Sequence, residues 1–193
     1  MLRALLLAPP GAGKGTQGEL LAAERGVPHF ATGDMLRRHV AEGSDIGTRA
    51  KAYMERGELV PDEIVNQLVA EAIGGDQPLD GFVLDGFPRT LEQAKLAYEW
   101  GQANNRTFNA VVSLAVPEAE LVRRMLERGA RDGRSDDTEE TVHRRQMVYD
   151  ESTKPLLDFY RERAILVEVD GVGTVPEVAD RIRAAIDALA TTD

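Results

Sequence analysis

The chain alternates between short, uniformly apolar runs and longer stretches in which apolar residues recur with helical spacing. Short runs that are apolar throughout are typical of strands covered on both faces, as in a parallel sheet. Strands are therefore predicted at residues 2–7, 28–30, 82–84, 111–116 and 165–169. Strands that alternate with helices indicate an α/β fold.

Polar residues mark helix starts between these runs. Thr174 and Glu177 have the spacing of a capping box, and so do Asp137 and Glu140. The last helix is predicted over residues 176–189, where the apolar residues repeat on one face.

Two stretches fit this sheet poorly. Residues 31–60 are polar and helical in pattern, and residues 127–137 are rich in arginine, aspartate and glycine. Insertions of this kind in an α/β enzyme are natural mobile flaps. The prediction is a single domain over residues 1–193, with these two flaps on a core of residues 1–30, 61–126 and 138–193.

Composition limits the classes of function. The chain has 193 residues, of which 42% are hydrophobic and 29% charged, the balance of an ordinary globular domain. The net charge of −10 disfavours nucleic acid and anionic membranes as partners, and no apolar run is long enough to cross a bilayer. The sequence has no cysteine, which excludes disulfides and thiolate metal sites. We expect a cytoplasmic protein that gathers positive charge locally wherever it binds an anion.

The strongest chemical signal is the segment Gly11-Ala12-Gly13-Lys14-Gly15-Thr16, which follows an apolar run and precedes a helical pattern. Glycines let successive backbone N–H groups point at one anion, and the N-terminus of the following helix adds its dipole. Lys14 can reach the β- and γ-phosphates of a nucleotide, and the Thr16 hydroxyl can bind phosphate or the shell of a metal ion. The segment predicts a phosphate-binding loop.

The loop departs from the general pattern at two places. Ala8 stands where the first glycine is usual, and Gly15 separates Lys14 from Thr16. A methyl group at residue 8 would strain the loop only if that position needs a positive φ, so we expect a modest effect. The alternative interpretation is an ordinary glycine-proline turn with a surface lysine.

Asp85 ends the predicted strand at residues 82–84. Ligands of open α/β sheets bind at the carboxyl ends of the strands, so Asp85 is placed to hold Mg²⁺ through water. A turn aspartate that only terminates the strand is the alternative. Arg89 leaves the same strand end and can meet an anion there. Gln93 stands three residues after Thr90 and also has a purely structural interpretation as part of a capping box.

Taken together, these segments resemble an adenylate kinase of the short-lid type, within the nucleoside monophosphate kinase family. The resemblance extends over essentially the whole chain. It rests on Gly11-Ala12-Gly13-Lys14-Gly15-Thr16, Thr32-Gly33-Asp34-Met35-Leu36-Arg37, Asp85-Gly86-Phe87-Pro88-Arg89-Thr90 and Gly133-Arg134-Ser135-Asp136-Asp137.

This resemblance implies a doubly wound, five-stranded parallel sheet with a phosphate loop and two mobile flaps. Residues 31–60 would cover a bound monophosphate, and residues 127–137 would form a short lid over ATP. The implied reaction is MgATP + AMP ⇌ 2 ADP, catalysed by a kinase that acts as a monomer in nucleotide homeostasis. The lid has no room for extra strands and no cysteines, so we expect no zinc and Mg²⁺ as the only metal.

The resemblance also assigns residues to the two substrates. ATP would be bound by Gly11, Ala12, Gly13, Lys14, Gly15, Thr16, Arg128 and Gly173. AMP would be bound by Thr32, Arg37, Glu58, Leu59, Val60, Gly86, Phe87, Pro88, Arg89, Gln93, Arg134 and Arg145. The catalytic cations would be Lys14, Arg89, Arg128, Arg134 and Arg145. Acidic residues near the lid arginines can hold those arginines after phosphate leaves.

The alternatives are other kinds of nucleotide protein. A UMP or CMP kinase would share the fold and most of the arginines. A nonenzymatic ATP-binding sensor is kept open by Ala8, although the full arginine set and Asp85 favour an enzyme. A GTPase switch is disfavoured because the chain lacks an Asn-Lys-x-Asp segment.

Overall fold

The computed structural model describes residues 1–74, 79–134 and 136–191. Within these residues the strands are β1 (Arg3–Leu7), β2 (His29–Ala31), β3 (Phe82–Asp85), β4 (Ala110–Ala115) and β5 (Leu166–Asp170). The helices are α1 (Lys14–Arg25), α2 (Thr32–Glu42), α3 (Asp45–Glu55), α4 (Asp62–Ile73), α5 (Leu91–Ala103), α6 (Glu118–Asp132), α7 (Glu139–Val148), the π-helix η1 (Tyr149–Thr153), α8 (Leu156–Arg161) and α9 (Val175–Ala190).

The described strands form one parallel five-stranded sheet in the order β2-β3-β1-β4-β5. The central strand β1 pairs with β3 and β4, so that Leu5 stands between Leu84 and Val111. Each predicted strand is confirmed to within one or two residues, and the runs of β1, β3 and β4 are the most deeply buried. The α/β fold and its five-stranded parallel sheet are therefore confirmed.

Helices cover both faces of the sheet, since successive side chains of a strand point to opposite faces. Ala4 and Leu6 pack with residues of α1, α6 and α9, whereas Leu5 and Leu7 pack with α5 and α8. A further cluster joins α2, α3 and α4 to Phe82 and Leu84 of β3. This two-sided burial explains why the strand runs are apolar throughout.

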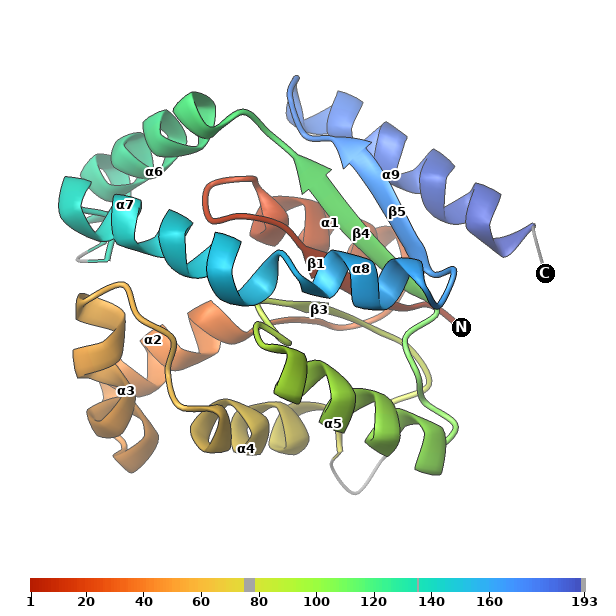
Figure 1. Ribbon diagram of the computed structural model, residues 1–193, viewed down its shortest axis with the longest axis horizontal. Helices are drawn as coiled ribbons and strands as arrows, with labels where there is room; N and C mark the ends of the chain where they lie inside the picture. The colour runs from red at the N-terminus through yellow and green to blue at the C-terminus, as the bar shows by residue number, and fades with distance from the viewer. Residues whose placement is uncertain (75–78, 135, 192–193) are drawn as a thin grey trace.

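The two segments that fit the sheet poorly in sequence lie at one end of the molecule. Residues 31–60 contain α2 and α3, and the other segment begins within α6 at residue 127 and ends shortly before α7. Figure 1 shows α2 and α3 below α6 and α7 at the left end of the molecule, with the loop between β1 and α1 nearer the centre of the view. The two pairs come close at Gly57, where a side chain would meet the Thr141 carbonyl oxygen at 3.0 Å.

Of the two capping boxes predicted at the starts of α7 and α9, the one at α9 is confirmed and the one at α7 is wrong. Thr174 and Glu177 cap α9 reciprocally, as expected. Helix α7 is instead capped by Thr138 with Thr141, one residue later than predicted. The Asp137 carboxylate is engaged by two arginines and does not serve as the cap.

None of the helices in the described ranges is long and apolar enough to cross a membrane.

Candidate active site

The loop between β1 and α1 has the backbone of an anion-binding turn. Gly11 and Gly13 have φ of +86° and +92°, which side chains rarely tolerate. A Cβ atom on Gly11 would also lie 2.7 Å from the Leu121 carbonyl oxygen. The glycines predicted from the sequence are thus required at these two positions, and Lys14 begins the helix that follows.

Lys14 turns back over this loop. Its Nζ donates hydrogen bonds to the carbonyl oxygens of Ala8 (2.9 Å) and Pro9 (3.1 Å). Burial lowers the pKa of Lys14 to about 8; nearby Arg89 and Arg145 lower it as well, while Asp85 opposes them. An anion entering the loop would favour the charged ammonium, because opposite charge stabilises it.

Ala8 does not adopt the conformation that would strain an alanine. Among the described non-glycine residues, only Asn105 and Ala164 have positive φ. The Ala8 methyl group is buried among the residues that pack on α1 and α6. The structure therefore contains no conformational obstacle to alanine at this position.

Asp85 ends β3 beside the phosphate loop and is buried. Burial raises the pKa of its carboxyl group, and the Lys14 ammonium opposes that shift. One carboxylate oxygen lies 3.9 Å from where a Cβ atom of Gly15 would stand. The Thr32 hydroxyl donates to the Asp85 backbone carbonyl (3.2 Å), which ties the ends of β2 and β3 together.

This donor set fits a hydrated magnesium ion carried by a nucleotide. In residues 1–74, 79–134 and 136–191, no three His, Asp or Glu side chains gather as a metal site. Magnesium commonly takes one or two carboxylates together with phosphate oxygens and several waters. Asp85 and the Thr16 hydroxyl stand where they could contribute in that way.

Arg89 is held in place by backbone and side-chain groups. Its Nε donates to the Gly86 carbonyl oxygen (2.8 Å), and burial lowers the pKa of its guanidinium. Its backbone N–H donates to Gln93 Oε1 (2.7 Å). The predicted capping box is half present: Thr90 caps α5 by accepting from the Gln93 N–H, but the Gln93 side chain points to other partners.

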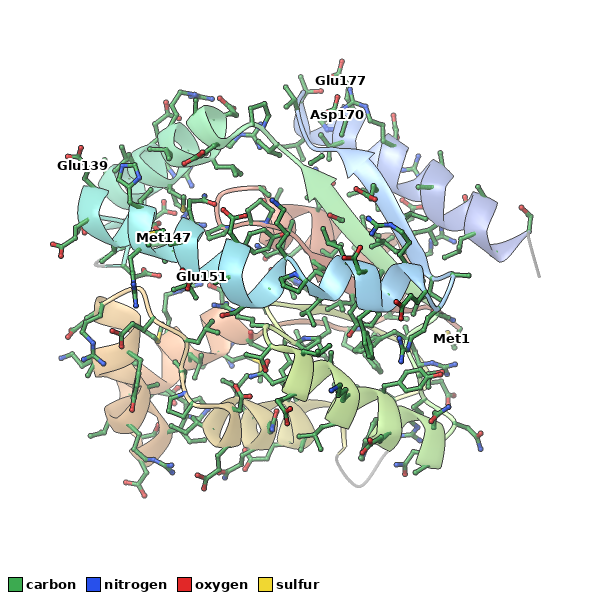
Figure 2. The ribbon with its side chains drawn as sticks, in the orientation of Figure 1. Met1, Glu139, Met147, Glu151, Asp170 and Glu177 are labelled. Carbon is green, nitrogen blue, oxygen red and sulfur yellow. The ribbon has the colours of Figure 1, made fainter. Side chains whose placement is uncertain are left out.

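Four arginines and three aspartates from the two helix pairs form a second assembly, called here the arginine–aspartate cluster. Its members are Arg37, Arg128, Arg134, Arg145, Asp34, Asp136 and Asp137. The α7 portion can be located in Figure 2, where Glu139 and Met147 are labelled on α7 and Glu151 on η1.

Asp137 is the buried centre of this cluster. Its side chain is fully inaccessible and accepts two hydrogen bonds from Arg128, at 2.7 and 2.8 Å. It also accepts from Arg145 Nη1 at 2.6 Å. Burial lowers the pKa of Arg145 to about 10, while Asp136 and Asp137 oppose the shift. The guanidinium groups therefore stay charged at neutral pH with aspartates as their partners.

The cluster also links the two helix pairs. Arg37 on α2 forms an ion pair with Asp34 and lies 3.5 Å from Asp136. From the other helix pair, Arg134 Nη2 lies 3.7 Å from Asp34 Oδ1. The sequence predicts acidic neighbours for the lid arginines, and aspartates from both segments pair with these arginines.

Two adjoining cavities meet at these cations. The inner cavity is lined by Thr32, Leu36, Met54, Gly57, Glu58, Leu59, Val60, Val65, Pro88, Gln93, Asp136, Val148, Tyr149 and Thr153, among others. The outer cleft is lined by residues that include Gly11, Gly13, Gly15, Thr16, Asp34, Asp85, Arg128, Arg131 and Arg134. Both are lined by Pro10, Lys14, Gly33, Arg37, Gly86, Arg89 and Arg145. Cations of four different segments thus converge where the two spaces join.

A few predicted site residues lie outside the lining of both spaces. The Phe87 side chain is buried with α4 and β3, and Ala12 is buried against α1 and α6. Gly173 lies in the turn between β5 and α9, close to Glu177 and Arg181; Asp170 and Glu177 mark this turn in Figure 2. Ser135, part of one motif, lies outside the described residues.

Sequence reasoning missed three residues around Arg89. Tyr149 and Thr153 of η1 line the inner cavity, and the Thr153 hydroxyl donates to the Arg89 carbonyl oxygen at 2.8 Å. Asp62, the first residue of α4, accepts from Gln93 and Thr90. The only signal for Asp62 was its place after Pro61 at a helix start, which predicts a cap and not a partner for Gln93.

Comparison with known proteins agrees with this site. Residues 6–165 match the family described as adenylate kinase. An adenylate kinase of Thermobifida fusca is 45% identical over 185 residues, which cover 96% of this chain and 98% of the relative. An adenylate kinase of Thermus thermophilus is 48% identical over 182 residues, covering 94% and 95% of the two chains. The chain, with its phosphate loop and converging arginines, therefore belongs to the adenylate kinase family.

Proposed function

We propose that this chain transfers the terminal phosphoryl group of MgATP to AMP and so forms two molecules of ADP. The observation that carries the proposal is the junction of two cavities at Lys14, Arg89 and Arg145. Two polyanionic substrates, one in each cavity, would bring their phosphates together at these cations. Membership of the adenylate kinase family supports the same reaction.

ATP is assigned to the outer cleft. The backbone of residues 11–16 curls around the β- and γ-phosphates, and Lys14 exchanges its bonds to the Ala8 and Pro9 carbonyl oxygens for phosphate oxygens. Arg128 reaches the phosphates from the lid side of the cleft. Ala12 contributes only its backbone, because its methyl group is buried in the core. Gly173 is assigned to the edge of the adenine site on resemblance alone.

AMP is assigned to the inner cavity. Residues 58–60 line it, and the Glu58 side chain is turned to Arg56 (2.8 Å), which leaves the segment to contact a base through its backbone. Thr32, Gly86, Pro88 and Gln93 complete the lining. In this assignment Arg37, Arg89, Arg134 and Arg145 face the phosphate of AMP, and Phe87 supports the loop from the core.

The reaction needs charge neutralisation more than proton transfer. The attacking group is an anionic phosphate oxygen, so no general base is required. Mg²⁺, which the adenylate kinase family generally uses with ATP, would be held by Asp85 through water and would neutralise phosphate charge. Lys14, Arg89, Arg128, Arg134 and Arg145 neutralise the transferring group and the acceptor, and they hold both in line.

Residues 31–60 and 127–137 are assigned as the moving parts, an AMP-binding flap and a short lid. The aspartates of the arginine–aspartate cluster form ion pairs with the lid and flap arginines when phosphate is absent. Substrate phosphates compete for the same guanidinium groups, and closure of the lid excludes water that would otherwise hydrolyse ATP.

The remaining assignments concern partners and location. We propose a monomer that acts in the cytoplasm on ATP, AMP and ADP, without nucleic acid or membrane as a partner. The net charge of −10 and the absence of cysteine support this.

The test is ADP formation from MgATP by the purified protein, with AMP, CMP, UMP, GMP or no acceptor in parallel. The proposal expects strong turnover with AMP. Turnover with CMP or UMP instead would reassign the inner cavity to another monophosphate. A folded protein that is inactive with every acceptor would contradict the proposal and favour an ATP-binding sensor.

A further inference from the structure

The Gln93 side chain is almost completely buried and has two fixed partners. Only 2% of the residue is exposed. Its Nε2 donates to Asp62 Oδ1 at 2.7 Å, and its Oε1 accepts from the Arg89 backbone N–H at 2.7 Å. Gln93 also lines the inner cavity, so these contacts are made at the wall of the proposed AMP site.

The polarity of these partners determines which way the Gln93 amide points. An ionised carboxylate can only accept hydrogen bonds, and a backbone N–H can only donate. If the amide were turned over, its oxygen would face Asp62 and its NH₂ group would face the Arg89 N–H. Both contacts would then be lost, so Asp62 and Arg89 together fix one orientation.

Asp62 is linked to the Arg89 loop by a second route. Its other oxygen, Oδ2, accepts from the Thr90 hydroxyl at 3.0 Å, and Thr90 in turn accepts from the Gln93 N–H at 3.2 Å. On the opposite side, the Thr153 hydroxyl donates to the Arg89 carbonyl oxygen at 2.8 Å. The backbone of Arg89 is therefore held at both its N–H and its C=O group.

A helix-start role alone does not explain these contacts. An acidic residue in the first turn of a helix stabilises it through the helix dipole, and Glu63 also satisfies that condition. Glu63, however, has 85% of its side chain exposed, and its one ion pair within the described residues is a 3.8 Å contact with Arg49. Asp62 uses both oxygens on residues 28 and 31 positions away, although it does not line either cavity itself.

We propose that Asp62 is a positioning residue for the AMP side of the site. Through Gln93 and Thr90 it fixes the Gln93 amide and the backbone of Arg89, and so the place from which the Arg89 guanidinium reaches the acceptor phosphate. Asp62 lies two residues after Val60, so it also connects the cavity-lining residues 58–60 to the Arg89 loop. This inference rests on the proposed function for its kinetic consequence, but its structural consequence is independent of turnover.

The test compares the unchanged chain with Asp62→Ser, Asp62→Asn and Glu63→Gln. Serine is a small polar residue that the first turn of a helix accommodates, but its single hydroxyl cannot bridge both Gln93 and Thr90. Asparagine keeps an acceptor for Gln93 Nε2, so it is the conservative rescue. Glu63→Gln removes a neighbouring charge from the same helix turn and is the matched control. The thermal unfolding midpoint is measured for each variant.

The expected kinetic result is specific to one substrate. Asp62→Ser lowers kcat/KM for AMP by about tenfold, the scale expected when a hydrogen bond to a charged group is lost. The KM for MgATP stays within about twofold, since the phosphate loop is not touched. Asp62→Asn recovers most of the loss, and Glu63→Gln behaves like the unchanged chain. Equal losses for both substrates, or a failure of Asp62→Ser to fold, would make Asp62 a structural residue only. Either result would overturn the proposal, and so would an Asp62→Ser variant as active as the unchanged chain.

Hydrogen exchange of the Arg89 backbone amide provides a readout that does not require activity. With Asp62→Ser we expect this amide to exchange at least about tenfold faster, because its acceptor Gln93 is released. Glu63→Gln should leave the rate unchanged. Unaltered exchange in Asp62→Ser would overturn the proposal even if the unchanged chain failed to turn over AMP, a failure that would count against the proposed function alone.

Discussion

The two cation-bearing parts of the site are held in different ways. Around the phosphate loop and Arg89, functional side chains are fixed mainly by backbone groups: Lys14 donates to two carbonyl oxygens, and Arg89 donates to the Gly86 carbonyl. In the arginine–aspartate cluster, the arginines are paired with carboxylates, and Asp137 engages both Arg128 and Arg145.

This difference means that the two parts of the site receive the substrate phosphates in different ways. The backbone partners follow the carboxyl ends of β1 and β3 and stay in place even when Lys14 turns to phosphate, so they preorganise a fixed end of the site. Carboxylate partners resemble phosphate in charge and geometry, so they can be replaced by it. A segment whose arginines are satisfied in both states can open and close without leaving buried charge unpaired.

The largest expected effect follows from removing an exchangeable arginine. Arg145→Ala should lower kcat by about 10³, since arginines that neutralise a transferring phosphoryl group contribute at that scale. Stability should change little, because Asp137 keeps Arg128 as a partner. The measurement is ADP formation at saturating MgATP and AMP, together with thermal unfolding.

The neighbouring Arg144 provides the control for this prediction. Arg144 is exposed, so Arg144→Ala removes the same charge from α7 without entering either cavity. Comparable rates for the two variants would mean that Arg145 acts as a surface charge, and the comparison between the two regions would fail.

A pH profile separates the two regions because their cations titrate at different pH. Lys14 has a pKa of about 8 in the folded chain, whereas Arg145 has one of about 10. The kcat/KM for MgATP should therefore fall by about tenfold per pH unit above about 8, as Lys14 loses its charge in the free enzyme. The kcat should hold to higher pH, because bound phosphate favours the ammonium.

Titration of Lys14 also changes the stability of the fold, and the direction of the change can be derived. An unfolded lysine has a pKa near 10.5, so below about 8 the folded state carries the full penalty of a buried charge. That penalty disappears as pH rises from 8 to 10.5, and Lys14 should then destabilise the fold less. Lys14→Arg should abolish the fall in kcat/KM over this range; an unchanged fall would assign it to another group.

The smallest expected effect is at Ala8. Because Ala8 is buried and has no positive φ, Ala8→Gly gains no conformational relief and should cost about 1 kcal/mol of folding free energy. The KM for MgATP should stay within about twofold. A clear gain in ATP affinity would show that the methyl group does distort the phosphate loop.

Sequence patterns predicted the parts of the molecule whose cause is local. The strand runs are apolar because each lies between two helix layers, and the phosphate loop needs glycine where φ is positive. The helical character of residues 31–60 is likewise confirmed as α2 and α3. The boundaries of the flap and lid remain predictions, and so do the roles of the individual site residues.

What sequence could not predict depends on contacts between distant segments. Asp62 and Thr153 reach Arg89 or its neighbours from 28 to 64 residues away, and no local spacing records such partners. The misplaced cap of α7 has the same origin. Asp137 has the composition of a cap, but pairing with Arg128 and Arg145 takes its carboxylate elsewhere.

The central claim is that nucleotide phosphates and aspartates compete for the same arginines, and Asp137→Asn tests it most directly. Thermal and denaturant unfolding would be measured with and without saturating MgATP and AMP, using Asp180→Asn, whose exposed ion pair with Arg183 lies outside both cavities, as control. Without nucleotide, Asp137→Asn should lose about 3 kcal/mol, because two partly buried guanidinium groups lose a partner. With both nucleotides bound the loss should shrink to about 1 kcal/mol or less, since their phosphates replace the carboxylate at Arg128 and Arg145. An equal loss with and without nucleotide would contradict the account.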